Sequence, residues 1–459
     1  MENKKSVKNI IIGIIGGGVI LSLLVCFIVA YNNTKISDNK AIVTKENSEN
    51  NVNNSDNVTN LNNKVSTTLD SKNSKITSDG TYDLSGEYES IIVNTSGDVT
   101  LNLNGVTITN SSGPAINIEK AKKVTIVLSG TNKITSTTTE DLDGAIYSKA
   151  DLVFSGTGSI EVKSNYDGIV SKDTLVIKNG TYTINSDDDG IRGKDSVEIS
   201  NGTFTINAGG DGIKSTNDED SSLGYINITG GTYNITSYND GIQAETNLTI
   251  KDGEFIIKTT DTSSSDSAKG LKAGNLITID GGKYDINATD DGIHSNINIT
   301  INNGKFDITA KDDGIHADGI VEINNGTFSI KAAEGIEATY VKLNDGNINI
   351  NATDDGINAG QKSEIGTPTI EINGGDITIT MAQGDTDGVD SNGDIIINGG
   401  TISVTGQSTF DYDGTGTING GTVICNGEQV TTLPNQFMGG GAKGGMPGGM
   451  TMNNLRQVR

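Results

Sequence analysis

The sequence is poor in several residue types that commonly decide a fold. Its 459 residues include no tryptophan, four prolines and two cysteines, and only 4% are aromatic. Two cysteines exclude a disulfide framework. Basic residues are also scarce: 33 Lys and Arg stand against 58 Asp and Glu, giving a net charge of −25. Such a chain lacks the basic surface that nucleic-acid binding requires, and its acidity indicates cation binding or a well-solvated exterior.

Charge is absent from residues 10–30, an apolar run of 21 residues that follows three lysines. Its length exceeds the ~7–15 residues of a signal-peptide core and matches the ~20 of a membrane span. The preceding lysines predict that the rest of the chain lies outside the cell. We therefore predict a cytoplasmic basic segment at residues 1–9 and a transmembrane anchor at residues 10–30, with cleavage as a signal sequence as the alternative.

Two further segments lack the apolar residues of a core. Residues 31–78 are mostly Asn, Ser, Thr and Lys, which is typical of a disordered tether. Residues 431–459 form a tail rich in Gly and Met, which we also expect to be disordered. One elongated domain is predicted between them, at residues 79–430.

What the sequence does have is a repeat. The glycine of an Asp-Gly-Ile motif recurs at Gly168, Gly190 and Gly212, 22 residues apart; after longer gaps that carry inserted loops, spacings of 22 or 21 residues return from Gly292 to Gly356. Apolar residues within each repeat alternate with polar ones in three short runs, which indicates strands rather than helices. Three strands in about 22 residues predict an all-β solenoid, a single-stranded parallel β-helix.

Equivalent residues of successive coils are expected to stack about 4.8 Å apart. The sequence can therefore be divided into columns, and the apolar columns are core. The aromatic column comprises Tyr182, Phe204, Tyr233, Phe255, Tyr284, Phe306 and Phe328. Cys425 falls in an inward column, and we predict a buried thiol there.

The residue before the recurrent glycine is nearly always acidic. This acid column comprises Asp167, Asp189, Asp211, Asp240, Asp291, Asp313, Glu334, Asp355 and Asp387. Two carboxylates 4.8 Å apart repel by about 3.5 kcal/mol at an effective dielectric constant of ~20. Backbone N–H groups, shared protons or Ca²⁺ would relieve this repulsion. Lys269 interrupts the column and is expected to neutralise both Asp240 and Asp291.

Several corners carry two acids in succession, and these predict calcium sites. The predicted ligands are Asp188, Asp189, Asp211, Asp290, Asp291, Asp312, Asp313, Asp354 and Asp355. The alternative is that an Asp before Gly only accepts hydrogen bonds within its own turn. The spacing fits neither an EF-hand nor a nonapeptide calcium repeat.

The residue after the recurrent Ile points outward, next to the acid column. This outward column contains the residues predicted to bind a ligand: Arg192, Lys214, Gln243, Lys272, His294 and His316. The alternative is a solvated face whose cations only offset the neighbouring acids. His294 and His316 lie one coil apart and are candidates to share a metal ion, although the sequence identifies no clear third ligand.

The NGTYTI, DDDGI and SVEI segments resemble the extracellular carbohydrate-binding β-helix proteins of anaerobic Gram-positive bacteria. This resemblance covers roughly residues 79–430, and the Gly/Met-rich tail is similar too. It implies a right-handed parallel β-helix that binds calcium and attaches to cellulose and acidic plant polysaccharides without being an enzyme. The lack of tryptophan departs from ordinary carbohydrate modules and leaves no obvious stacking surface for crystalline cellulose.

We therefore expect a monomeric, calcium-dependent binding protein for extracellular polysaccharide, with an acidic polygalacturonate-like glycan favoured over cellulose. It would sit on the outer face of the cell membrane, or be secreted if the N-terminal segment is cleaved. One alternative is a polysaccharide lyase on the same scaffold, with Arg192 or else Lys214 as the base. The other is a surface adhesin with a protein partner.

Overall fold

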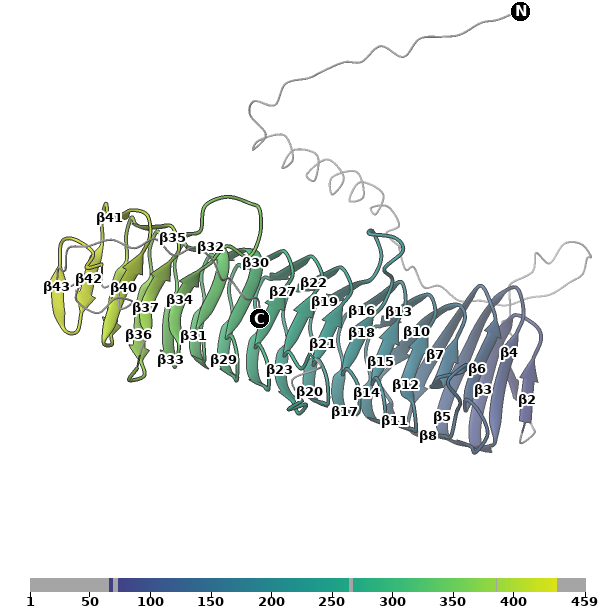
Figure 1. The fold of residues 1–459 in the computed structure, drawn as a ribbon. Coiled ribbons are helices and arrows are strands. Elements are labelled where there is room, and N and C mark those ends of the chain that lie inside the picture. Colours follow the sequence, from purple (N-terminus) through teal and green to yellow (C-terminus); the bar gives the residue numbers. More distant parts are fainter. Residues whose placement is uncertain (1–65, 69–72, 264–266, 385, 436–459) are drawn as a thin grey trace, which may run out of the picture. The chain divides into compact units, whose positions relative to one another are not determined.

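The computed structural model describes residues 66–68, 73–263, 267–384 and 386–435. These ranges form 43 β-strands in one hydrogen-bonded sheet and contain no helix (Figure 1). They all belong to the second of two units, which divide the chain at residues 62 and 63. The predicted anchor at residues 10–30 lies outside the described residues. Among the described residues, no helix is long and apolar enough to span a bilayer.

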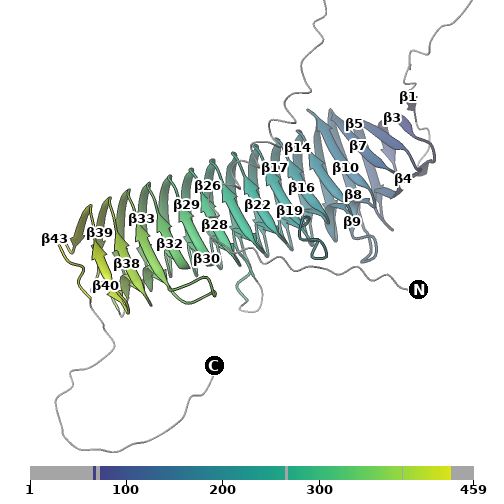
Figure 2. The ribbon, with the colours of Figure 1, turned by 90° about the horizontal axis from the view of Figure 1, so that it is seen from above.

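The strands form three parallel ladders, and the first contains the aromatic column. Each strand pairs with its equivalent in the next coil, as Figure 2 shows for β14, β17, β26 and β29. The ladder consists of the second parts of β3 (Gly80–Tyr88) and β5 (Asp98–Asn110), then β8 (Thr131–Ser136), β11 (Ser159–Ser164), β14 (Thr181–Ser186), β17 (Thr203–Ala208), β20 (Thr232–Ser237), β23 (Glu254–Thr259), β26 (Lys283–Ala288), β29 (Lys305–Ala310), β31 (Thr327–Ala332), β33 (Asn347–Ala352), β36 (Asp376–Met381), β39 (Thr401–Thr405) and β42 (Thr422–Cys425). A short antiparallel strand, β43 (Glu428–Val430), pairs with β42 and ends the ladder.

The second ladder carries the Asp-Gly-Ile motif and the outward column. Its strands are β2 (Asn73–Ile76), β4 (Ser90–Asn94), β6 (Ile116–Lys120), β9 (Gly144–Ser148), β12 (Asp167–Ser171), β15 (Ile191–Gly193), β18 (Ile213–Ser215), β21 (Ile242–Ala244), β24 (Leu271–Ala273), β27 (Ile293–Ser295), the first parts of β30 (Ile315–Ile323) and β32 (Ile336–Leu343), β34 (Asp355–Ala359), β37 (Asp387–Ser391) and β40 (Ser408–Tyr412). Most of these strands are short because tight corners bound them on both sides.

The third ladder closes each coil. It contains β1 (Ser66–Thr68), the first parts of β3 and β5, then β7 (Lys123–Ser129), β10 (Asp151–Gly156), β13 (Thr174–Ile177), β16 (Ser196–Ile199), β19 (Tyr225–Ile228), β22 (Asn247–Ile250), β25 (Leu276–Ile279), β28 (Asn298–Ile301), the second parts of β30 and β32, β35 (Thr369–Ile372), β38 (Asp394–Ile397) and β41 (Gly416–Ile418). Three parallel ladders are consistent with the predicted solenoid; the right-handed winding stays a prediction.

The core lies between the ladders and confirms the predicted apolar columns. The aromatic rings from Tyr182 to Phe328 are buried and stack at centroid distances of 4.6 to 4.9 Å. Cys425 is only half-buried, in contrast to the prediction. The reason is its place on β42, the last parallel strand of its ladder, which only the short β43 covers.

The glycine of the Asp-Gly-Ile motif is required for space. At Gly212, an added Cβ would lie 2.4 Å from Ile235 Cγ2 and 2.5 Å from the carbonyl oxygen of Gly241. In the preceding turn, Gly202 instead has a φ of +142°, which disfavours any residue with a side chain. The backbone therefore has little free space at each motif glycine, and the acid-column residue immediately precedes it.

Candidate functional site

The acid column lies at the corner between the first and second ladders. Most of its members are almost inaccessible to water: Asp167 is 1% exposed, and Asp211, Asp240 and Asp291 are 2% exposed. A buried carboxylate without partners is costly, so each must be stabilised by hydrogen bonds or by opposite charge. Both kinds of partner are present.

Backbone N–H groups satisfy one oxygen of most of these carboxylates. Asp189 donates its N–H to Asp167 Oδ1 at 3.0 Å, and Asp211 donates to Asp189 Oδ1 at 2.8 Å. The same bond recurs from Asp240 to Asp211 and from Lys269 to Asp240, both at 2.8 Å. Each coil therefore holds the acid of the coil before it, and part of the repulsion within the column is relieved without any metal ion.

The outward column supplies the other partner. Arg192 Nε donates to Asp167 Oδ2 at 2.7 Å, Lys214 Nζ lies 2.6 Å from Asp211 Oδ2, and Lys272 Nζ lies 3.2 Å from Asp240 Oδ2. These three cations are 17%, 27% and 24% exposed. They point away from the core as predicted, but they are half-buried and ion-paired. This arrangement favours the interpretation in which the cations offset their acidic neighbours.

The charge balance appears in the pKa values. Burial lowers the pKa of Arg192, but Asp167 and Asp143 outweigh it and raise that pKa above its usual value. Burial also lowers the pKa of Lys214, and the carboxylates of Asp189 and Asp211 raise it above the usual range. Both side chains are therefore held as cations.

Lys269 acts differently from the prediction. Its ammonium group contacts Asp290 Oδ2 at 2.6 Å and Asp291 Oδ2 at 2.9 Å. Asp240 receives only its backbone N–H and is neutralised by Lys272 instead. Lys269 thus neutralises one of the two predicted column members, because its side chain extends toward the following coil.

The structure brings predicted calcium ligands together in two groups, one of which also includes Asp167, an acid-column residue outside the predicted set. The carboxylates of Asp167, Asp188 and Asp189 lie within 4.8 Å of one another, and so do those of Asp290, Asp291 and Asp312. Asp313 instead groups with His316 and Glu337. In the part of the chain that the structure describes, Asp211, Asp354 and Asp355 belong to no such group.

An open hollow of about 340 Å³ adjoins the second group. It is lined by Asp261, Thr262, Ser263, Ala268, Thr289, Asp290, Lys311 and Asp312. Burial, together with the nearby Asp291 and Asp290, raises the pKa of Asp312. The sequence did not predict Asp261 as a site residue because it lies in the loop inserted between β23 and β24, outside the 22-residue repeat.

The C-terminal coils present acids with few cations. Burial raises the pKa of Glu334 to about 8, and Glu337, Asp313 and Asp355 add to the shift. Burial and neighbouring carboxylates likewise raise the pKa of Asp390 to about 7. Among the described residues, no Lys or Arg forms an ion pair with Glu334 or Asp390. The sequence already indicated this shortage of cations, since the outward column changes from Lys and His to Glu337, Asn358 and Asp390.

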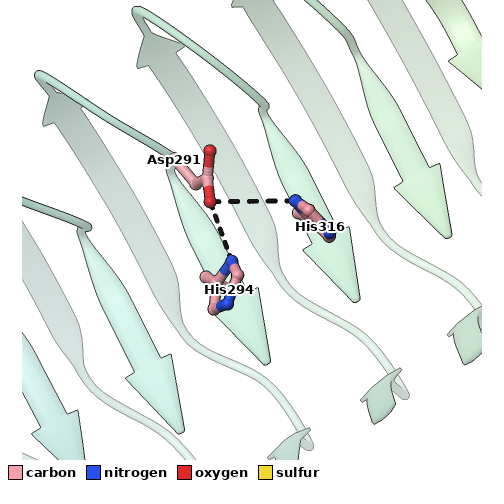
Figure 3. Close-up of side chains that lie close together, drawn as sticks. All are labelled: Asp291, His294 and His316. Atoms are coloured by element: carbon pink, nitrogen blue, oxygen red, sulfur yellow. Dashed lines mark hydrogen bonds and ion pairs between the residues drawn. The ribbon is translucent and has the colours of Figure 1, made fainter. Parts of the chain in front are cut away.

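The remaining predicted ligand residues lie along the second ladder. Gln243 is half-buried on β21, paired in register with Lys214 on one side and Lys272 on the other. His294 and His316 are register partners on β27 and β30, and both lie beside Asp291 (Figure 3). Asp291 is thus the third donor that the sequence did not identify.

Exposed aromatic side chains are scarce on the described surface. The large apolar side chains most exposed there are Tyr238, Ile256, Leu276, Ile297 and Ile365. Tyr238 is the single aromatic residue among them, at 45% exposure. A sugar chain would therefore find hydrogen-bonding and charged groups on this surface rather than a row of rings.

Comparison with known proteins gives the family. No curated protein matches the chain. A solved structure, that of the polysaccharide lyase-like protein from C. thermocellum as a gadolinium derivative, is 30% identical to it. That match covers 48% of this chain and 86% of the other, with a TM-score of 0.40. A family model for carbohydrate-binding domain-containing proteins matches residues 70–314 and 308–431, most of the chain. The chain therefore belongs to the carbohydrate-binding domain-containing family.

Proposed function

We propose that this protein binds an acidic extracellular polysaccharide through calcium, without cleaving it. Membership of the carbohydrate-binding family supports a polysaccharide as the partner. The choice of an acidic glycan and of calcium rests on the charges around the acid column.

The observation that carries the proposal is the acidic hollow at Asp290 and Asp312. Calcium takes six to eight oxygen ligands, usually carboxylates, carbonyls and water. The hollow offers the carboxylates of Asp261, Asp290 and Asp312, and the hydroxyl groups of neighbouring Thr and Ser residues. Burial raises the pKa of Asp312, and the negative charges of Asp291 and Asp290 raise it further. These donors fit a hard divalent cation and would hold it, and the ion would supply a positive charge at the surface.

Calcium also explains how so acidic a protein would bind an acidic glycan. With a net charge of −25, the protein repels polyanions at long range. Arg192, Lys214 and Lys272 were expected to contact uronates, but each is already paired with an aspartate. A bridging cation shared between protein and glycan carboxylates removes both difficulties, and a neutral glucan would not benefit from it.

The state of the two candidate bases supports a binding role over a lyase. A general base must be unprotonated at the working pH. The carboxylates around Arg192 and Lys214 raise the pKa of each side chain, so both stay protonated.

We further propose a right-handed winding, an N-terminal anchor at residues 10–30 and a position on the outer face of the membrane.

Binding to immobilised polygalacturonate, measured with calcium and with a chelator, tests this function. We expect calcium-dependent binding that falls at least tenfold in D290N/D312N. The matched control is D285N/D307N, which removes two exposed acids from β26 and β29, in the same two coils but on the outer face of the first ladder. The proposal fails if the two double variants bind alike, if a chelator has no effect, or if a neutral glucan competes as well as polygalacturonate. Release of unsaturated sugars would instead indicate a lyase.

A further inference from the structure

Beyond polysaccharide binding, we propose that Asp291, His294 and His316 form a site for one divalent transition-metal ion of the zinc class. The site adjoins the oxygen-lined hollow, because the Asp291 carboxylate lies within 4.8 Å of those of Asp290 and Asp312, and it uses the two histidines of the whole sequence. Its three donor groups lie within 4.8 Å of one another (Figure 3).

The donor spacing suits a tetrahedral ion. His294 Nδ1 lies 2.8 Å from Asp291 Oδ2, and His316 Nδ1 lies 3.9 Å from the same oxygen. Ligand atoms about 2.0–2.1 Å from a tetrahedral Zn²⁺ are about 3.3 Å apart. The observed distances lie on either side of this value, so small side-chain rotations suffice. The register between β27 and β30 holds the two rings 4.9 Å apart, centroid to centroid.

Hydrogen bonding orients His294 for ligation. Its Nε2 lies 3.0 Å from Asn296 Oδ1, an oxygen that can only accept, so Nε2 carries the hydrogen. In the neutral ring this leaves a lone pair on Nδ1, which faces Asp291 Oδ2. Two acceptors cannot face each other at 2.8 Å unless a proton or a metal ion lies between them. A ligating histidine commonly donates its other ring N–H in this way.

His316 faces an excess of negative charge. Its Nδ1 lies 2.8 Å from Asp313 Oδ2 and 3.5 Å from Glu337 Oε2, in addition to Asp291. Its Nε2 is buried without a hydrogen-bond partner, with Asp318 Oδ1 3.6 Å away. A divalent ion bound by both imidazoles would balance two of these carboxylates.

The donor types select the metal. Imidazole nitrogen suits zinc, copper and nickel, whereas calcium takes oxygen ligands. Two lysines already contact the group: Lys269 Nζ lies 2.9 Å from Asp291 Oδ2, and Lys362 Nζ lies 2.6 Å from Glu337 Oε1. Lys269 also reaches Asp290 at 2.6 Å and keeps that partner when Asp291 binds the ion. Lys362 leaves the second oxygen of Glu337 facing His316.

The competing explanation is that both histidines are only protonated counter-ions, equivalent to the lysines of the earlier coils. The variant H294K/H316K separates the two explanations, because lysine keeps the positive charge and the fold but supplies no imidazole. A control variant, D312N, alters the hollow, keeps the pair between Lys269 and Asp290, and leaves both histidines unchanged.

The experiment uses the full chain without a histidine tag. Zn²⁺ binding is measured by equilibrium dialysis, and the ligand field by the visible absorption of bound Co²⁺. We expect about one tightly bound Zn²⁺ in wild type and in D312N, and an affinity at least 100-fold lower in H294K/H316K. The proposal is overturned if wild type binds no Zn²⁺ or if H294K/H316K binds it equally well. Weaker calcium-dependent glycan binding in D312N with intact zinc binding would separate this site from the proposed function.

Discussion

Two regions of the solenoid share one repeat but differ in how their buried acids are neutralised. In the coils of β12 to β24, Asp167, Asp211 and Asp240 each pair with Arg192, Lys214 or Lys272 of the outward column. In the coils of β32 to β37 the outward column carries Glu337, Asn358 and Asp390 instead. Asn358 donates hydrogen bonds to Glu334 Oε2 and Glu337 Oε1 but brings no charge.

The difference shows that the acid column by itself has no fixed function. The backbone bond from the next coil recurs in both regions, since Asp387 donates its N–H to Asp355 Oδ1 at 3.1 Å. What changes is the outward-column side chain beside the acid, which comes from the same coil for Asp211 and from the next coil for Asp167 and Asp240. A cation there makes the pair a structural element, whereas an amide or another acid leaves negative charge unbalanced. The hollow and the histidines lie between these two regions.

Removing a cation from the first region should have the largest effect. R192Q leaves Asp143, Asp167 and Asp189 without their shared partner, and breaking such a buried pair costs about 3–5 kcal/mol. We expect a loss of this size in urea denaturation. The matched control is K194Q, since Lys194 pairs with Glu219 at 3.2 Å while Glu219 is 77% exposed. There the expected loss is about 0.5 kcal/mol. Equal losses would show that Arg192 contributes no more than a surface pair.

The second region should give a stability that depends on pH, measured with a chelator present. In the unfolded chain Glu and Asp titrate near pH ~4. The folded pKa is about 8 for Glu334 and about 7 for Asp390, so the folded state keeps protons that the unfolded chain has lost. Their stabilisation is complete below pH ~4 and is lost as the pH rises through 7 to 8. Because both side chains keep some contact with water, we expect about 2 kcal/mol between pH 5 and 8.

The variant E334Q/D390N isolates this contribution from that of other groups. Its free energy of unfolding should change less between pH 5 and 8 than that of wild type. Parallel pH profiles for the two proteins would contradict the assignment of the unbalanced charge to these acids.

Introducing a cation into the second region should make it resemble the first. N358K places an ammonium group beside Glu334 and Glu337, so we expect a gain of about 1 kcal/mol at pH 8, within the range for partly exposed pairs. The gain should shrink at pH 5, where the raised pKa of Glu334 leaves its carboxyl protonated. N351K is the control, because Asn351 is exposed on β33 of the same coil. If both lysines stabilise equally, the effect comes from net charge and not from the column.

The sequence alone determined most of the fold. A period of about 22 residues, within which apolar and polar residues alternate, is compatible with few architectures. Because equivalent residues of successive coils stack, the apolar columns can then be assigned without knowledge of the contacts. The ring stack from Tyr182 to Phe328 followed directly. The position of the acid column and its outward neighbours followed as well, because both keep a constant distance from the motif glycine.

Tertiary structure decided which partner each charge takes. Whether Lys269 extends to the coil before or after it depends on side-chain direction, which the repeat does not specify, and it contacts Asp291. The hollow also depends on Asp261, which a loop outside the repeat brings back to the corner. Asp291 joins His294 and His316 because the three residues converge across adjacent coils. A column identifies which residues are neighbours, but short-range electrostatics depends on distances and directions that only the folded chain fixes.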